Sequence, residues 1–367
     1  MIDDVFDGKI TIDGSSIYGM SDVNNSDLLL VPDLETFRRL PIDDNDFGNV
    51  GMFMCFVHDP SGKPAKGCTR SILKSELNGM IKLGFDKMNV GFEPEFFLLK
   101  AKPSAPNDTT VQLDYGSYAD IEAGSDFGGR IRREICFEFE RVGIIPLSIH
   151  HERSPSQHEI TFKFDNALRS CDNFILYKII AKAVAKNHGL YLDFDPKVFD
   201  GANGNGCHVN VSLSKDDKNV FACNDGLSDV ARHFLSGLID NAKAITYFAN
   251  SKESSYKRLV PNCEAPTKIC WGYHNRSAFI RVPKASGNAT RIELRSPDME
   301  MNPYLAVTGI LRAGLDGIKR KSEPPDPVDL NAWKHVKAYG LPSSLEIARR
   351  EFEGTKLLSS ITGGVND

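Results

Sequence analysis

The chain has 367 residues, of which 41% are apolar and 25% are charged. This composition is typical of a globular protein with enough chain for one large domain and a smaller one. The net charge of -5 and the pI near 6.0 provide no basic surface for nucleic acid. The first residues contain neither a basic region nor an apolar run, and no later stretch reaches membrane-spanning length. We therefore expect a cytoplasmic protein with no nucleic-acid partner and no membrane partner.

The eight cysteines show no Cys-x-x-Cys pair and no close spacing with histidine. This spacing disfavours a zinc site or an iron–sulfur cluster. We expect most of the thiols to be reduced and to serve as small packing residues.

Short strand-like runs occupy residues 10–12, 28–31 and 52–57, each bounded by Gly, Asp or Pro. Runs of this length between turn residues are typical of a small β-rich domain. We predict one such domain over residues 1–62 and a larger domain over residues 63–367.

In the larger domain, helical and strand periodicities alternate along the sequence. Helices are predicted over residues 70–83, 131–142, 165–187, 227–249, 303–319 and 345–352, and strands over 90–99, 144–151, 159–164, 207–213, 279–282 and 291–295. Asp165 or Asn166 is the expected N-cap of the third helix, and Pro303 suits the first turn of the fifth. The predicted fold class is α+β.

Two acidic residues interrupt the apolar run VGFEPEFFLL at residues 90–99. Side chains alternate between the faces of a strand, so Glu93 and Glu95 point to the same side, about 6.6 Å apart. Charged carboxylates in so apolar a stretch require a cation nearby. The pair therefore predicts a metal site.

Four further polar residues stand in other extended stretches: Glu152, Glu159, His208 and Glu293. Carboxylate oxygens with a single imidazole suit Mg²⁺ or Mn²⁺ better than zinc, which would favour cysteine and more histidine. With Glu93 and Glu95, these residues predict a site for hard divalent cations. Such cations commonly serve phosphoryl transfer, which is the chemistry we expect.

The sequence around Glu293 and the glycine-rich residues 201–206 suggest how a phosphate ligand is held. Arg291, Glu293 and Arg295 share one face of the predicted strand, where they can contact metal and phosphate together. The glycines allow backbone to approach a ligand closely. Neither a G-x-G-x-x-G nor a G-x-x-x-x-G-K-[ST] pattern is present. ATP would therefore be held by metals, arginines and groove walls.

At this level the chain resembles the glutamine synthetase family, in its bacterial type I branch. The likeness runs from about residue 13 to residue 344. It rests on ordered motifs at residues 13–16 (DGSS), 91–97 (GFEPEFF), 150–159 (HHERSPSQHE), 203–208 (NGNGCH), 256–266 (YKRLVPNCEAP), 275–281 (NRSAFIR), 291–298 (RIELRSPD) and 302–306 (NPYLA). The resemblance implies a partial N-terminal β-grasp domain, followed by a catalytic domain with a curved antiparallel sheet or half-barrel flanked by helices.

The resemblance also implies an activity, namely the ATP-dependent ligation of ammonia to the γ-carboxylate of L-glutamate. The reaction would pass through γ-glutamyl phosphate and give L-glutamine, ADP and phosphate. Two or more Mg²⁺ or Mn²⁺ ions are implied in each active site. One ion, near glutamate and ammonium, would be held by Glu95, Glu152 and Glu159, and one, at the ATP phosphates, by Glu93, His208 and Glu293.

Further roles follow from the same motifs. The implied catalytic residues are Asp13, Glu264, Arg276, Arg281 and Arg291. The implied glutamate-binding residues are Asn203, Gly204, His208, Arg258 and Arg295. The implied ammonium-binding residues are Asp13, Ser16, Tyr118, Glu152 and Glu264, and the implied ATP-binding residues are Asn210, Ser212, Arg276 and Arg291. Glu264 would lie on a mobile flap that closes over glutamate and excludes water.

The implied assembly is a homo-oligomer with active sites between the subunits of a hexameric ring. The Asp13 segment would reach into the adjacent subunit. Relative to the family, we expect the chain to be shortened at both termini, which leaves open whether two rings stack. No tyrosine lies in residues 330–336, where some members are adenylylated, so we do not expect that control.

Three hypotheses about function remain open. The first is glutamine synthetase itself. The second is a ligase that joins glutamate to an organic amine, because Asn262 and Cys263 replace the usual Gly-Tyr of the flap and Ala119 replaces an aromatic residue. The third is a catalytically silent binding or structural relative, motivated by the shortened ends.

Some other polar residues have simpler interpretations. We expect His150 and His151 to pack or to support the site rather than to bind metal. Arg132 is expected on the solvent face of its helix.

Overall fold

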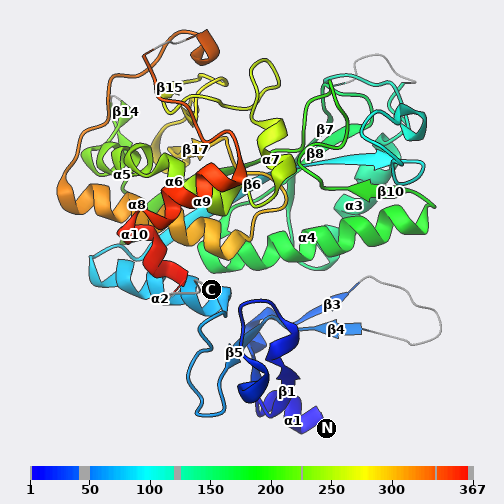
Figure 1. The fold of residues 1–367 in the computed structure, drawn as a ribbon, viewed down its shortest axis with the longest axis vertical. Coiled ribbons are helices and arrows are strands. Elements are labelled where there is room, and N and C mark those ends of the chain that lie inside the picture. The colour runs from blue at the N-terminus through cyan, green and yellow to red at the C-terminus, as the bar shows by residue number, and fades with distance from the viewer. Residues whose placement is uncertain (1, 41–49, 120–124, 225, 335–336, 363–367) are drawn as a thin grey trace.

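The computed structural model describes residues 2–40, 50–119, 125–224, 226–334 and 337–362. A small N-terminal β unit lies beneath a larger unit in which helices cover a wide sheet (Figure 1). In the small unit, three antiparallel strands form a sheet in the order β1-β2-β5, beside a separate β3-β4 pair. The elements are α1 (Ile2–Phe6), β1 (Ile10–Asp13), β2 (Asp27–Pro32), β3 (Arg38–Leu40), β4 (Val50–Met52) and β5 (Cys55–His58).

The strands predicted at residues 10–12 and 28–31 are confirmed as β1 and β2. The run at residues 52–57, predicted as one strand, is divided between β4 and β5. The division arises because the backbone of Met54 bonds elsewhere. Its N–H donates to Thr36 Oγ1 at 2.8 Å, and its carbonyl accepts from the N–H of Asp33 at 2.8 Å.

The large unit is built on a ten-stranded sheet whose main path is β15-β16-β17-β11-β6-β8-β7. Its strands are β6 (Lys87–Leu99), β7 (Pro146–His151), β8 (Gln157–Phe162), β9 (Asp165–Asn166), β10 (Tyr191–Asp193), β11 (Cys207–Lys215), β12 (Lys218–Asn219), β15 (Trp271–Tyr273), β16 (Ile280–Val282) and β17 (Ile292–Leu294), and β13 (Ala222–Cys223) pairs separately with β14 (Gly226–Leu227). Within this path only β15 and β16 pair in parallel. Across the described residues the sheet stays open and does not close into a barrel.

Helices cover one face of the sheet (Figure 1). The helices of the large unit are α2 (Thr69–Lys82), α3 (Gly129–Arg141), α4 (Ala167–Asn187), α5 (Asp229–Asp240), α6 (Ala242–Ala249), α7 (Glu253–Arg258), α8 (Pro303–Arg320), α9 (Leu345–Glu353) and α10 (Lys356–Ser359). The core between helices and sheet includes Phe92, Phe174 and Tyr177, all buried. Alternation along β6 buries Phe92 and Phe96 against the helices and turns Glu93 and Glu95 the other way.

The helix predicted over residues 227–249 is wrong in one respect, because it consists of two helices. Asn241 lies between α5 and α6, and its side-chain amide donates to the carbonyl of Gly237 at 2.9 Å. This contact ends α5. Gly237 also allows close packing against α8, since a Cβ there would lie 2.1 Å from the carbonyl oxygen of Ala313.

Capping residues confirm two predicted helix starts. Asn166 caps α4 by accepting from the N–H of Arg169 at 3.1 Å. Asn302 caps α8, and Pro303 occupies its first position. Residue types that favour helix starts thus fix the ends of two long helices.

Arg70 of α2 links the two units. Its guanidinium donates to Asp172 of α4 at 2.9 and 2.8 Å and to Asp33 of the N-terminal unit at 2.8 Å. The buried hydroxyl of Tyr304 also donates to Asp172, at 2.7 Å. A division of the chain into domains at residue 62 stays a prediction.

Candidate active site

A cavity of about 610 Å³ lies on the face of the sheet that the helices leave open. Its lining residues come from most of the predicted motifs. They include Glu93, Glu95, Tyr118, His150, Glu152, Gln157, Glu159, Asn203, Gly204, His208, Arg258, Cys263, Glu264, Arg276, Arg281 and Arg295. Five of the six predicted metal ligands therefore line one cavity, and the sixth, Glu293, lies fully buried at its wall.

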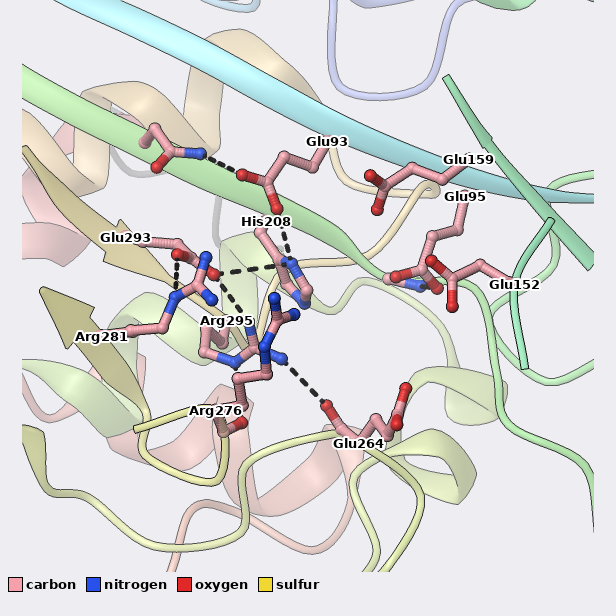
Figure 2. Close-up of polar contacts among 12 residues, drawn as sticks. Glu93, Glu95, Glu152, Glu159, His208, Glu264, Arg276, Arg281, Glu293 and Arg295 are labelled. Carbon is pink, nitrogen blue, oxygen red and sulfur yellow. Dashed lines mark hydrogen bonds and ion pairs between the residues drawn. The ribbon is translucent and has the colours of Figure 1, made fainter. Parts of the chain in front are cut away.

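The first cluster of metal-ligating atoms comes from Glu93, His208 and Glu293. Strand register brings them together, because His208 stands opposite Glu93 and β17 flanks β11 on the other side. His208 Nδ1 lies 3.1 Å from Glu93 Oε2 and 3.6 Å from Glu293 Oε1 (Figure 2). The other oxygen of Glu93 accepts from the Asn210 amide at 2.9 Å. This cluster matches one predicted ligand set.

The second cluster comes from His150, Glu152 and Glu159. His150 Nε2 lies 2.8 Å from Glu152 Oε1 and 3.8 Å from Glu159 Oε1. The sequence interpretation had assigned His150 to packing or support, whereas its ring nitrogen faces the cavity with the two carboxylates. Glu95 stands opposite Glu159 in the register of β6 and β8. Its carboxylate accepts from the N–H of Gly206 at 2.8 Å and from the Gln157 amide at 3.2 Å.

The electrostatics of the cavity suit divalent cations. Burial and the neighbouring charge of Glu152 raise the pKa of Glu95 to about 8. Burial, then Glu93 and Glu95, raise the pKa of Glu159 well above its usual range. Burial and Arg295 hold the pKa of His208 well below its usual value, so its imidazole is neutral and able to bind metal. Oxygen donors with one imidazole in each cluster fit Mg²⁺ or Mn²⁺.

Three guanidinium groups converge next to the first cluster (Figure 2). Glu293 accepts from Arg281 Nε at 2.5 Å and from Arg295 Nη1 at 2.6 Å. Arg295 also donates to the carbonyls of Arg276 and Glu264, at 2.9 and 3.4 Å. The Arg276 side chain lines the cavity. Two of the predicted catalytic arginines, Arg276 and Arg281, and the predicted glutamate-binding Arg295 therefore adjoin the first cluster.

The remaining arginine, Arg258, is held by backbone oxygens. Its Nη1 donates to the carbonyl of Ser296 at 2.7 Å and its Nη2 to that of Arg295 at 3.2 Å. The residue is 2% exposed and still borders the cavity. Its guanidinium is fixed in place, with its remaining N–H groups left to meet a carboxylate.

The segment around Glu264 borders the cavity in an unusual backbone conformation. Asn262 and Glu264 have φ values of 65° and 55°, in the left-handed region that favours glycine. The Glu264 carboxylate lies 3.4 Å from Arg153 Nη1. Cys263, which lies between Asn262 and Glu264 in the sequence, lines the cavity. Strain of this kind is concentrated at functional segments.

A second cavity of about 340 Å³ adjoins the first and shares Glu93 and Thr161 with it. It contains three of the four predicted ATP-binding residues, Asn210, Ser212 and Arg291, while Arg276 lines the first cavity. Arg291 Nε donates to Asn210 Oδ1 at 2.9 Å. The wall of the second cavity also contains Leu147 and the half-exposed ring of Phe164, neither of which was predicted as a site residue. The signal available in the sequence was an aromatic residue, Phe164, at the end of the strand predicted over residues 159–164.

Asp13 and Ser16 do not line either cavity within the chain. They lie at the end of β1 in the N-terminal unit, at the bottom of Figure 1. Asp13 accepts from the hydroxyls of Ser15 and Ser16, each at 2.6 Å, and these contacts lower its pKa. The structure thus brings together the predicted metal and phosphate residues but not these two ammonium residues.

Arg132 was predicted on the solvent face of its helix, and that prediction is wrong. The residue is 6% exposed and donates to Asp126 at 2.8 Å. The loop before α3 folds over this position, a contact that no local pattern reveals.

Across the described parts of the chain, no helix is both long enough and apolar enough to span a bilayer.

Fold and site together define a class of protein. It is an α+β protein whose open sheet carries two carboxylate–imidazole clusters beside converging arginines, an arrangement suited to metal-assisted phosphoryl transfer. Family models described as "Glutamine synthetase, catalytic domain" and "Glutamine synthetase, beta-Grasp domain" match residues 66–364 and 1–60. The chain belongs to the glutamine synthetase family and is a ligase of that family.

Individual relatives agree with this assignment. The glutamine synthetase of Thermococcus kodakarensis is 41% identical over 365 residues, which cover 97% of this chain and 79% of that protein. The Thermus thermophilus enzyme is 43% identical over 333 residues, covering 89% and 74% of the two chains. Among solved structures, a GmaS/ADP complex superposes with a TM-score of 0.87 at 32% identity, covering 99% of this chain and 84% of the other. Plasmodium falciparum glutamine synthetase gives 0.84 at 26% identity, covering 98% and 84%.

Proposed function

We propose that the chain catalyses ATP-dependent ligation of ammonia to the γ-carboxylate of L-glutamate, through γ-glutamyl phosphate, giving L-glutamine, ADP and phosphate. The observation that carries this proposal is the pair of cation clusters on opposite sides of one cavity, next to three arginines. In-line phosphoryl transfer needs positive charge around both the attacking and the leaving oxygens. The arginines, together with cations held by the two clusters, would supply it.

The cation ligands follow from the two clusters. Glu93, His208 and Glu293 would hold the ion at the ATP phosphates. Glu152, Glu159 and the adjoining Glu95 would hold the ion next to glutamate, with His150 close enough to contribute. Bound cations neutralise phosphate charge and polarise the oxygens of the transferring group.

The second cavity suits the nucleotide. Asn210 and Ser212 present polar groups along β11, and Arg291 and Phe164 offer planar surfaces for a base. Because Glu93 borders both cavities, phosphates extending from a base in the second would reach the first cluster. Arg276, Arg281 and Arg291 would then stabilise charge on the transferring phosphoryl group.

Glutamate would occupy the first cavity beneath the flap. Arg258 and Arg295 carry the fixed positive charge for its carboxylates, and Asn203 and Gly204 border the same space with His208. Closure of the segment around Glu264 would exclude water from γ-glutamyl phosphate, which is essential in a ligase. The Glu264 carboxylate would accept a proton from the adduct.

The ammonium pocket would be completed by a second copy of the chain. Tyr118, Glu152 and Glu264 border the cavity, while Asp13 and Ser16 do not. Next to Asp13, Tyr18 and Val23 are 101% and 86% exposed, an apolar surface suited to an interface. We therefore infer a homo-oligomer, arranged as a hexameric ring, in which the Asp13 loop enters the neighbouring site. Asp13 would bind ammonium and deprotonate it.

An organic amine is the second candidate nucleophile. It is favoured by Cys263, whose small side chain faces the cavity beside Glu264, and by Ala119, whose left-handed backbone (φ 60°) follows Tyr118. The small side chain of Cys263 leaves space in the cavity that a bulkier side chain would narrow, and Ala119 removes an aromatic ring next to Tyr118.

The test measures phosphate release by the full chain with ATP, Mn²⁺ or Mg²⁺ and glutamate, comparing ammonium, a panel of alkylamines and no nucleophile. Ammonium-dependent phosphate and glutamine in equal amounts support the proposal. A preference for an alkylamine supports the second candidate. Nucleotide binding without any nucleophile-dependent phosphate contradicts both and favours a silent relative.

A further inference from the structure

Three groups of side chains among the described residues bring metal-ligating atoms within 4.8 Å of one another, and two of them belong to the cavity. The third group consists of Asp114, His151 and His158, which are 0%, 1% and 0% exposed. It lies directly behind the second cation cluster, because His151 and His158 face each other in the same ladder that pairs His150 with Glu159. The proposed reaction gives this group no role.

The third group is not built to bind a metal. Arg132 Nη1 lies 2.6 Å from His158 Nδ1, and the same guanidinium pairs with Asp126. Because a guanidinium only donates hydrogen bonds, it occupies the lone pair that a metal would need. A permanent positive charge at that distance also opposes a cation. The group therefore serves another purpose.

The contacts of Asp114 indicate that purpose. Its Oδ1 accepts from His151 Nε2 at 3.0 Å and from the N–H of Ser156 at 2.9 Å, while its Oδ2 accepts from the N–H of Gly128 at 3.3 Å. The other ring nitrogen of His151, Nδ1, donates to the carbonyl of Glu152 at 2.5 Å. Because both ring nitrogens donate, the His151 ring is an imidazolium, and it connects a buried carboxylate to the backbone of a proposed cation ligand.

The same histidine also contacts the segment that forms one wall of the proposed ammonium pocket. Its carbonyl accepts from the N–H of Ala119 at 3.0 Å, next to Tyr118, which lines the cavity. The chain passes close to the ring at Gly116, where a Cβ would lie 2.5 Å from His151 Nε2. Only glycine allows this approach.

We propose that Asp114 is a positioning residue. Through His151 it fixes the backbone of Glu152 and of Ala119, and so holds the Glu152 carboxylate and the Tyr118 ring in place around the second cation cluster. This inference rests on the proposed function only in taking Glu152 as a cation ligand. Removing outer partners of metal ligands commonly weakens metal affinity about 10- to 100-fold.

The test is the binding of Mn²⁺ to the full-length chain, followed by the electron paramagnetic resonance signal of the free ion. We expect Asp114→Asn to weaken one of two Mn²⁺ sites by about tenfold or more. The apparent KM for Mn²⁺ should rise by a similar factor, and saturating Mn²⁺ should restore most of kcat. A purely structural role for Asp114 would not produce this rescue by metal.

Asp172→Asn provides the matched control. Asp172 is also a buried, hydrogen-bonded carboxylate, but its partners are Arg70 and Tyr304, outside the cavity. We expect it to lower the melting temperature and to leave both Mn²⁺ affinities unchanged. Loss of Mn²⁺ affinity in both variants to the same extent would overturn the positioning role, as would wild-type affinity in Asp114→Asn.

Ser156→Ala keeps the proposal testable if Asp114→Asn does not fold. The Ser156 hydroxyl accepts from the N–H groups of Leu113 and Asp114, at 2.8 and 3.1 Å, so its loss loosens the carboxylate without removing it. We expect Mn²⁺ binding about two- to fivefold weaker, a fraction of the full effect. Unchanged binding overturns the proposal. A wild-type chain that binds no Mn²⁺ overturns the proposed cation site as well.

Discussion

The cavity and the Asp13 loop are both acidic, but their carboxylates are stabilised in opposite ways. In the cavity, burial and mutual repulsion raise the pKa values of Glu95 and Glu159. In the loop, an exposed Asp13 has its pKa lowered by two serine hydroxyls. The cavity therefore needs added cations to ionise fully, whereas the loop is already an anion that can attract ammonium. The proposed function assigns phosphoryl transfer to the cavity of one chain and capture of ammonium to the Asp13 loop of another.

The largest effect is expected from removing a cation ligand in the cavity. Glu159→Gln should lower nucleophile-dependent phosphate release by roughly 10³-fold or more, because one metal no longer offsets charge in the transition state. Glu300→Gln is the control, since Glu300 pairs with Lys178 and Lys252 outside the cavity. Steady-state assays at saturating Mn²⁺ compare the two. Near-normal activity in Glu159→Gln would contradict the cavity's role.

Asp13→Asn should act on the other side of the comparison. We expect about a 10²-fold loss of activity, typical of a missing general base, with Mn²⁺ and ATP affinity unchanged. Mixing dissociated Asp13→Asn and Glu159→Gln subunits and allowing them to reassemble should then restore part of the activity. Restoration occurs only if Asp13 of one copy serves the cavity of another. Mixed oligomers that stay inactive would show that the loop does not cross between chains.

Phe164→Ala tests whether the second cavity binds the base of ATP while the first binds glutamate. Loss of a ring that stacks on the base should raise the KM for ATP by about tenfold, since stacking on an aromatic side chain is worth about 1–3 kcal/mol. The KM for glutamate should change little. Phe137→Ala, which removes another exposed phenylalanine, in α3, is the control. An equal change in both Michaelis constants would argue against base binding in the second cavity.

The smallest effect concerns pH. The pKa of Glu95 in the folded chain, about 8, exceeds the usual 4.5, so the folded state retains a proton that the unfolded state releases. Stability from this group is complete below about pH 4.5 and is lost as the pH rises towards 8. We expect the melting temperature of metal-free protein to fall by a few degrees between pH 5.5 and 8. Mn²⁺ or the Glu95→Gln substitution should flatten this slope, and a slope unchanged by either would contradict the assignment.

Much of the fold could be predicted because local patterns determine it. The alternation of β6 places Glu93 and Glu95 on one face, Asn166 caps α4 as expected, and Pro303 stands in the first turn of α8 as expected. The break at Asn241 was missed because apolar periodicity continues through it, while the side chain bonds back to Gly237.

The site could be predicted less completely, since it depends on contacts between distant segments. The β7–β8 register turns His150 towards Glu152 and Glu159, and no spacing within residues 150–159 reveals which way its ring points. Asp114 had no sequence signal, because its partner His151 lies 37 positions away. Burial of Arg132 likewise follows from the loop that covers it.

Crystals of the full chain grown with Mn²⁺ and ADP would test the two-cation cavity most directly. Anomalous scattering should show one manganese among Glu93, His208 and Glu293. A second manganese should lie next to Glu152 and Glu159, within reach of Glu95 or His150. Manganese found only outside the cavity, or one ion bridging Asp114 and His158, would contradict the assignment.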